Sequence, residues 1–453
     1  MTMAPRRPAR PRVRRLRPAR SVVASFAMVI HIGTGVLMLP FSARSGDGPN
    51  FFHALFTATS AVCVTGLTVV DTATHWSPFG QVVILVLVQL GGLGIMVSAA
   101  TIGLFLARKM SVASRLTAAM EVNTVRFDDV RKLVRNIVLI SLIIEAATFL
   151  FLFPRFAFGY GYDLGEAAWL GLFHSVSSFN NAGFALFSDN LMGFAADPFI
   201  CLPICAAIIL GGLGFPVLMQ LRREFPHPLR WTMNTRIVLS ASIILLLVGT
   251  VYIGALEWSN PRTLGSYDPA ARLLIAFFHS VQTRTAGFNS VDIGLMHDET
   301  WVGMDVLMYI GAGPAGTAGG IKVTTFAVLW FILLTELRGE PSVHIFGKRL
   351  SRAVHRQAIS VVVLSIAAIM ASVIALMIIT GRPFGKVLFE AVSAFGTVGL
   401  STGITYDLPP SAEMILVLLM FLGRLGPLTI GSALALRDRR TLYEYPTERP
   451  AIG

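Results

Sequence analysis

Four glycines that recur at equivalent places along the chain are the residues best suited to chemistry. They are Gly66, Gly183, Gly287 and Gly399, spaced by 104 to 117 residues, and each ends a short apolar segment. Glycine reaches backbone conformations that other residues rarely adopt, which allows a loop to aim successive carbonyl groups at one axis. A ring of such carbonyls replaces the hydration shell of a monovalent cation. The pattern therefore predicts a cation-selective filter made of four loops.

A second glycine-marked stretch follows each of these glycines, 24 to 28 residues further along. The stretches are residues 91–94, 211–214, 311–313 and 423–426, and all of them lie in long apolar segments. One unit repeated four times predicts a pore with fourfold pseudosymmetry, since each copy supplies one loop to it.

The composition indicates an integral membrane protein. The chain is 54% hydrophobic and 14% charged, whereas a soluble domain carries about 25% charged residues. The first twenty residues hold eight arginines, which is too many for the start of a cleaved signal peptide. The three cysteines, Cys63, Cys201 and Cys205, indicate neither a disulfide framework nor a metal site, and we expect them to pack as small apolar residues.

The apolar segments predict an all-α membrane protein with eight spanning helices and four re-entrant pore loops. The expected spans are residues 21–40, 79–107, 136–153, 198–221, 237–256, 302–334, 358–380 and 414–436. Between the two spans of each pair lies a segment too short for the roughly 20 residues that a crossing requires. These segments are residues 51–62, 165–179, 269–282 and 384–395. We interpret each as a re-entrant pore helix, because non-helical backbone at that depth must line a cavity or be buried in protein.

These elements divide the chain into a basic arm, four repeats, a linker and a tail. The arm is 1–20, the repeats are 21–107, 134–221, 231–338 and 355–436, the linker is 108–133 and the tail is 437–453. With both termini inside, 28 of the 37 Lys and Arg residues lie on the inner side and six on the outer side. This asymmetry predicts cytoplasmic termini and pore loops that open outward. The positive charge reports topology, so we expect no nucleic acid partner.

The loops that end at the four glycines supply the predicted filter, with K⁺ bound at their backbone carbonyls. The filter residues are Cys63, Val64, Thr65, Gly66, Asn180, Asn181, Ala182, Gly183, Arg284, Thr285, Ala286, Gly287, Gly396, Thr397, Val398 and Gly399. The short helix before each loop directs its negative C-terminal end toward the cavity, which favours a cation there.

Six separated segments carry a resemblance to one family. The segments TATSAVCVTGLTVVDT, FHSVSSFNNAGFALF, SVQTRTAGFNS and FEAVSAFGTVGLSTG resemble the filter regions of the Trk/Ktr/HKT superfamily of potassium transporters. The segments GTAGGIKVTTFAV and MFLGRLGPLTIGSAL resemble two further signatures of that superfamily. The chain is most similar to its Ktr-type bacterial membrane subunits, and the resemblance covers nearly the whole sequence.

The resemblance implies potassium uptake across the inner (cytoplasmic) membrane by a homodimer in which each protomer holds its own pore. It also implies a cytosolic nucleotide-binding ring as the regulatory partner, with any ATP or ADP site on that ring alone. The chain has neither G-x-x-x-x-G-K-[ST] nor a G-x-G-x-x-G that opens a helix after a strand. We therefore expect no bound cofactor, with K⁺ as the transported ion and Na⁺ as a candidate activator.

Residues 311–320 hold five glycines and one proline, which cannot form a regular helix. One interpretation is a kink filled by neighbouring helices, whereas the resemblance implies a gating loop below the filter. The family's usual loop, G-G-S-P-G-S-T-A-G-G, has serines where this chain has Gly313 and Gly316. The expected gate residues are Gly311, Gly313, Pro314, Gly316, Thr317, Gly319, Gly320, Lys322 and Arg424.

Arg424 takes the position that Gly92, Gly212 and Ala312 hold in the other repeats. A charge inside a spanning helix is costly and usually faces the protein interior. We expect Arg424 to face the ion path near residues 311–320, as an electrostatic barrier or as an anchor for that loop. The alternative is an ion pair with an intramembrane acid such as Glu145.

Several other polar residues lie near the predicted filter. We expect Arg284 and Glu390 to form an ion pair behind it, because an exposed arginine would repel cations. Asp71 is interpreted equally well as a residue that concentrates cations at the outer mouth or as a helix cap. We expect His174 and His279 to be packed, hydrogen-bonded groups without a chemical role.

Two other classes of function stay open. The first is a sodium-selective or ion-coupled carrier of the same superfamily. In plant relatives a serine in place of the first filter glycine goes with sodium preference, so Gly66 favours potassium. The second and remote class is a membrane enzyme or a non-transporting scaffold. We expect no enzymatic activity, because the acids and histidines form no nucleophile–base pair or metal cluster in the sequence.

Overall fold

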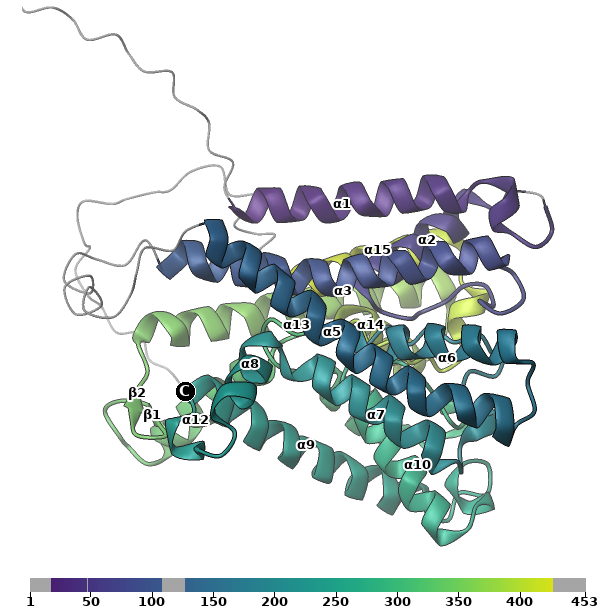
Figure 1. Cartoon of the computed structure of the whole chain (residues 1–453). Helices are drawn as coiled ribbons and strands as arrows, with labels where there is room; N and C mark the ends of the chain where they lie inside the picture. The colour runs from purple at the N-terminus through teal and green to yellow at the C-terminus, as the bar shows by residue number, and fades with distance from the viewer. Residues whose placement is uncertain (1–17, 47, 108–126, 427–453) are drawn as a thin grey trace, which may run out of the picture.

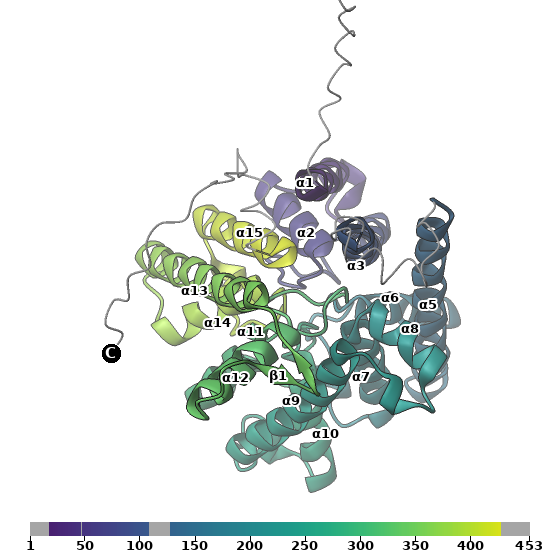
Figure 2. The same ribbon diagram turned by 90° about the vertical axis from the view of Figure 1, so that its left-hand side faces the viewer.

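The computed structural model describes residues 18–46, 48–107 and 127–426, and these residues are mainly helical (Figure 1). The first repeat contains α1 (Pro18–Leu37), α2 (Phe51–Cys63) and α3 (Pro78–Ala107). Helix α1 packs against α2 and α3, and α3 packs in turn against α5 of the next repeat. Figure 2 shows the repeats following one another around the molecule in chain order.

The second repeat contains α5 (Phe127–Pro154), α6 (Leu164–Phe179), α7 (Pro198–Leu213) and α8 (Phe215–Glu224). Helices α7 and α8 meet at Gly214 with a bend of 98°. The predicted span over residues 198–221 is therefore broken at Gly214 and does not form one continuous helix. Gly214 has a φ of +89°, which ends a right-handed helix, and Pro216 offers no N–H to continue the hydrogen bonding.

The third repeat contains α9 (Met233–Glu257), α10 (Pro269–Gln282), α11 (Asp298–Tyr309) and α12 (Val323–Leu337). Residues 310–322, between α11 and α12, form no helix, as the glycine-rich sequence predicts. The fourth repeat contains α13 (Arg352–Thr380), α14 (Phe384–Gly396) and α15 (Pro410–Leu425). A hairpin of β1 (His344–Ile345) and β2 (Lys348–Arg349) joins the last two repeats.

Short helical turns connect the longer elements. They are η1 (Pro40–Ser42), η2 (Arg155–Gly159), η3 (Met192–Phe194), η4 (Pro228–Arg230), η5 (Leu264–Ser266), η6 (Ile293–Leu295) and η7 (Ile404–Asp407).

The four short helices α2, α6, α10 and α14 each carry buried residues through their C-terminal halves. Each begins and ends within one residue of a segment predicted to be re-entrant. Side-chain caps start three of them, from Asn50, Asp163 and Asp268, because these residues accept the free N–H groups of a first turn. A phenylalanine in each helix is completely buried: Phe56, Phe173, Phe278 and Phe389.

Three described helical segments are long and apolar enough to cross a membrane: Arg131–Gly159, Met233–Glu257 and Arg352–Thr380. The bent pair α7 and α8 makes a fourth if it is one span. Large apolar side chains on these segments are exposed, including Leu150 (66%), Val251 (70%) and Ile378 (79%), and such a surface suits a lipid environment. The eight predicted crossings remain a prediction.

Candidate ion pathway

The four predicted filter loops share one backbone conformation. In each loop the glycine has positive φ, and so does the residue two positions before it. Those earlier residues are Val64 (56°), Asn181 (58°), Thr285 (72°) and Thr397 (50°). Three of them are β-branched, and left-handed backbone costs such residues about 1–3 kcal/mol each. The same strained backbone at four equivalent places indicates that the surrounding structure imposes this conformation on all four loops.

The four glycines also close a ring. Each faces the carbonyl oxygen of the residue before the glycine in the next repeat, so closely that an added Cβ would lie within 3.0 Å of that oxygen. The pairs are Gly66 with Ala182, Gly183 with Ala286, Gly287 with Val398 and Gly399 with Thr65. The order runs from repeat 1 to 2, 3, 4 and back to 1. The loops therefore surround one central point, and any side chain at these positions would force them apart.

Hydroxyl groups from the pore helices hold these loops in place. Six residues before the glycine, Ser60 and Ser393 accept hydrogen bonds from the N–H groups of Gly66 and Gly399, both at 3.1 Å. In repeat 2 the corresponding Ser177 donates to the Phe184 carbonyl at 2.8 Å. Repeat 3 lacks this serine and uses the side chain of Gln282, which accepts from Phe288 N at 3.1 Å.

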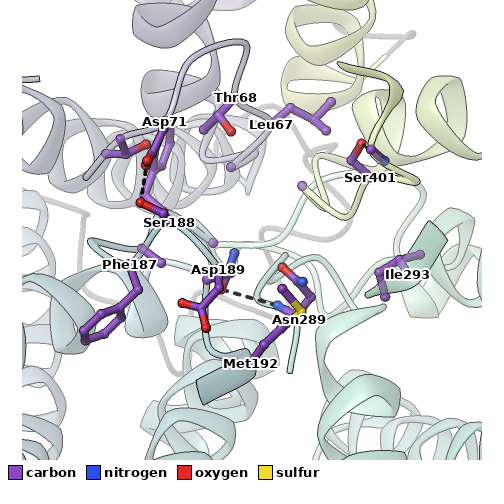
Figure 3. Close-up of a pocket in the computed structure, with 18 of the residues that line it drawn as sticks. Leu67, Thr68, Asp71, Phe187, Ser188, Asp189, Met192, Asn289, Ile293 and Ser401 are labelled. Atoms are coloured by element: carbon purple, nitrogen blue, oxygen red, sulfur yellow. Dashed lines mark hydrogen bonds between the residues drawn. The ribbon is translucent and has the colours of Figure 1, made fainter. Parts of the chain in front are cut away.

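A cavity of about 220 Å³ lies beside the glycines and is lined by residues from all four repeats (Figure 3). Asp71, Asp189 and Asp292 contribute carboxylates to its wall. Asp71 accepts a hydrogen bond from Ser188 at 2.6 Å and so joins the loops that leave the first two filter segments. It caps a local turn through Ala73 N at 2.9 Å and no helix.

The charge of Asp71 is retained at neutral pH. Burial acts to raise the pKa of this carboxyl, but hydrogen bonds from Ser188, Thr74 and Ala73 outweigh burial and hold the pKa below its ordinary value. A carboxylate at the wall of such a cavity raises the local concentration of cations.

Residues 310–322 lie against the filter loops and contact repeats 2 and 4. Gly319 packs against the Thr397 side chain of the fourth filter loop. The Thr317 hydroxyl and the Asn181 side-chain amide of the second loop lie 2.8 Å apart. Lys322 Nζ donates to the Ala318 and Gly319 carbonyls at 2.6 and 3.2 Å, which fixes the end of the segment.

Arg424 is buried at the end of α15 and holds this segment from the side of repeat 4. Its guanidinium donates to the Thr317 carbonyl and, at 3.0 Å, to the Gly91 carbonyl of α3. Glu145 instead accepts from Gln89 at 2.9 Å, so the alternative of an Arg424–Glu145 ion pair was wrong. Arg424 thus bridges the predicted gate to the first repeat.

The expected ion pair between Arg284 and Glu390 does not form. Arg284 donates to the Ser242 carbonyl at 3.0 Å and to its hydroxyl at 3.1 Å, because its side chain runs outward to α9. Glu390 accepts hydrogen bonds from Ser401, Thr402 and Thr405, which follow its own filter loop. Each group therefore supports the loop of its own repeat.

The two histidines and the three cysteines lie in buried positions, where they pack against their neighbours. His174 is completely buried, with its ring bonded to the Leu170 carbonyl at 2.8 Å and to Leu186 N at 3.4 Å. His279 is equally buried beside Ser290. The three cysteines are free and buried. Within the described residues, no group of three or more histidine, cysteine or acidic side chains could hold a metal ion.

One part of the pathway was missed from the sequence. The break at Gly214 exposes the backbone of α7 to residues 313–317, which bond to it directly. The signal was present in Pro216, which follows the glycine stretch of repeat 2 and has no counterpart in repeat 1.

Comparison with known proteins gives concordant results. Residues 13–437 match the TrkH family, described as cation transport protein. The Ktr system potassium uptake protein B of Vibrio alginolyticus is 39% identical over 96% of this chain and 94% of its own length. The potassium/sodium uptake protein NtpJ of Enterococcus hirae is 34% identical over 97% and 98%. The crystal structure of the potassium transporter TrkH from Vibrio parahaemolyticus superposes with a TM-score of 0.74 at 18% identity, covering 95% of this chain and 87% of that one, which shows a shared fold.

Proposed function

This chain belongs to the TrkH family of cation transport proteins, and we propose that it takes up potassium through the ring of four filter loops. The proposal rests on the cyclic arrangement of Gly66, Gly183, Gly287 and Gly399, each packed against a carbonyl of the next loop. Such a ring offers backbone oxygens from four sides to one ion, which is how a dehydrated monovalent cation is held.

The helices that lead into the ring favour a cation over an anion. Helices α2, α6, α10 and α14 all end at the filter loops, so their C-terminal carbonyls converge on one region. The partial negative charge of a helix C-terminus stabilises a cation nearby. The carboxylates of the 220 Å³ cavity add to this preference at one mouth of the path.

The gate of this pathway is residues 311–320 with Lys322 and Arg424. Two observations support the assignment: the segment lies against the filter loops, and Arg424 anchors it through the Thr317 carbonyl. A segment rich in glycine can move without breaking a regular element. Displacement of the segment would open the path, and Arg424 would act as its anchor.

The working protein in this proposal is a homodimer in the inner membrane with both termini in the cytoplasm. The excess of Lys and Arg on one side supports the orientation. Similarity to potassium uptake proteins of Ktr systems supports a cytosolic regulatory partner, which we propose to be a nucleotide-binding ring that holds any ATP or ADP.

A second candidate is coupled transport of potassium and sodium. The Enterococcus relative named a potassium/sodium uptake protein is 34% identical over nearly the whole chain. In this case Na⁺ would activate or accompany uptake.

Uptake of rubidium-86 into proteoliposomes of the purified chain tests both candidates. We expect K⁺ to inhibit rubidium uptake at concentrations at least about tenfold lower than the Na⁺ concentrations that give the same inhibition. Equal competition by the two ions would favour the sodium-using alternative, and stimulation of uptake by Na⁺ would indicate coupling. Absence of flux, both alone and with a Ktr-type regulatory ring added, would contradict transport by this chain.

A further inference from the structure

The break between α7 and α8 is occupied by the predicted gate. Gly313 N donates to the Gly212 carbonyl at 2.8 Å, and Thr317 N donates to the Gly211 carbonyl at 3.2 Å. In the opposite direction, Phe215 N donates to the Ala315 carbonyl at 3.2 Å. The last carbonyls of a helix have no partner inside the helix, and here the gate segment supplies the donors.

A continuous helix would exchange these hydrogen bonds for its own. With α7 and α8 joined, Phe215 N would donate to the Gly211 carbonyl four residues earlier. The Gly212 carbonyl would gain nothing, since its partner would be Pro216, which has no N–H. Release of the gate segment therefore leaves one carbonyl without a donor, and this deficit favours the bent state.

The hinge for such a change is Gly214. Its φ of +89° belongs to the bent state, and an added Cβ would collide with the Pro314 carbonyl of the gate segment. Glycine adopts helical backbone as well, so the residue permits both states. Repeat 1 shows the second one: Gly91-Gly92-Leu93-Gly94 has the same sequence as residues 211–214 but lies within the continuous helix α3.

Helix α8 reaches from this hinge to the start of α9. Gln220 Oε1 accepts hydrogen bonds from Thr232 N at 3.1 Å, from the Thr232 hydroxyl at 3.0 Å and from the Thr235 hydroxyl at 2.6 Å. These bonds join the middle of α8 to the start of α9. The bent state is therefore held at the hinge and again along α8.

We propose that the break between α7 and α8 is the docking site of the gate segment. The pathway is closed when residues 313–317 are hydrogen-bonded to the bent α7–α8 pair, and it opens as the helix straightens at Gly214. In this scheme Pro216 and Gln220 are positioning residues that favour the closed state. The role of this break in gating rests on the proposed transport function. The exchange of hydrogen bonds itself concerns backbone groups and can be measured without flux.

The test is Pro216→Ala, which restores an N–H for the Gly212 carbonyl in the straight state. Pro203→Ala is the matched control, because Pro203 lies inside α7 away from the break. Spin labels at Leu202 and Phe225, which are 46% and 72% exposed, report the distance between α7 and the end of α8. We expect Pro216→Ala, but not Pro203→Ala, to add a longer-distance population and to raise rubidium uptake about two- to tenfold, the shift that one hydrogen bond produces.

A second variant, Gln220→Ala, should shift the same distance distribution in the same direction. Identical distributions in the wild type, Pro216→Ala and Gln220→Ala proteins would overturn the proposal. A shift in distance without any cation flux in any variant would uphold the hinge and contradict the proposed transport function. Flux that does not change when the distance shifts would overturn the role of the break in gating.

Discussion

The filter loops and the layer directly beneath them are each built from four copies of one sequence unit, but only the filter keeps its symmetry. All four filter loops share two positive φ angles and a glycine packed against the next loop. Beneath them, one glycine stretch lies in a continuous helix, one sits at a bend of 98°, one becomes the loop 310–322 and one carries Arg424. Ion coordination requires equivalence, whereas a gate requires one copy that can move relative to the others.

The comparison of repeats 1 and 2 shows how little sequence separates the two outcomes. The stretch Gly-Gly-Leu-Gly is the same in both, and its first glycine packs in each case against a carbonyl four residues before the filter glycine, at Val62 and at Phe179. Only after this contact do the backbones diverge. The asymmetry therefore starts below the filter and leaves the ring undisturbed.

The largest expected effect comes from removing the link between the gate segment and the first repeat. Arg424→Ala deletes both hydrogen bonds of the guanidinium, to the Thr317 and Gly91 carbonyls. Hydrogen bonds from a charged group contribute about 1.5–3 kcal/mol each, so uptake of rubidium by proteoliposomes should rise at least about tenfold.

Arg424→Lys distinguishes two roles of Arg424: an anchor that holds the gate segment, and an electrostatic barrier in the ion path. Lysine keeps the charge but cannot reproduce the planar fork that reaches two carbonyls. An anchor predicts raised uptake in this variant as well. Uptake at the wild-type rate in Arg424→Lys, with raised uptake in Arg424→Ala, would assign the effect to charge alone.

A change within the symmetric layer should alter selectivity and leave gating intact. Gly66→Ser places a side chain against the Ala182 carbonyl of the next loop and should reduce the preference for K⁺ over Na⁺ by about tenfold, or 1.4 kcal/mol. Competition of the two ions with rubidium uptake measures it. Gly35→Ser is the control, because no atom lies within 4 Å of a Cβ at that position. Unchanged discrimination in Gly66→Ser would show that this loop does not contact the ion.

A smaller effect is expected at the break of repeat 2. Gly214→Ala strains a residue with φ of +89° and collides with Pro314, so it destabilises the closed state and should raise uptake about threefold. Gly426→Ala is a close control, since Gly426 has a φ of +80° but no atom of the described residues lies within 4 Å of an added Cβ. If both variants raise uptake equally, backbone strain accounts for the increase and the collision with the Pro314 carbonyl does not.

The smallest effect is expected at the outer cavity. Asp71→Asn removes one carboxylate from a partly exposed wall, where electrostatic effects are about 0.5 kcal/mol, so uptake at low K⁺ should fall about twofold. Because the pKa of Asp71 lies below its ordinary value of 3.8, its charge is present above that value and is lost only as the pH falls through the lowered pKa. Uptake should therefore show no step from this residue between about pH 5 and 8.

Glu299→Gln is the control for this variant, since Glu299 is exposed but does not line the cavity. A clear step in the uptake of the wild-type protein between pH 5 and 8 that disappears in Asp71→Asn would contradict the lowered pKa.

The symmetric parts of the molecule could be predicted from the sequence. The pore helices were found within one residue, because apolar segments of 12 to 15 residues between longer ones leave few alternatives. The conformation of the filter loops also followed from the recurrence of glycine. The interruption at residues 310–322 was evident because five glycines and a proline exclude a helix.

The partners of individual polar residues could not be predicted. Arg284 was assigned to Glu390 because both lie near the filter, but each has hydrogen-bonding groups within its own repeat, and side-chain direction decides between them. The bend at Gly214 was missed because apolar character continues across it, and Pro216 alone does not show that a segment about a hundred residues away bonds to the break. Contacts between separate segments determine these features, and they leave little trace in any one segment.

The central claim is that four loops from one chain form a single ring around the ion. The most direct measurement is rubidium uptake by four single variants, Gly66→Ala, Gly183→Ala, Gly287→Ala and Gly399→Ala, with Gly35→Ala as control and thermal unfolding of each protein as the check on folding. The account predicts that in all four the preference for K⁺ over Na⁺, measured by competition with rubidium uptake, falls to a similar extent while the proteins still unfold cooperatively, because each Cβ would meet a carbonyl of the next loop. A folded variant that retains wild-type uptake and selectivity would contradict the ring.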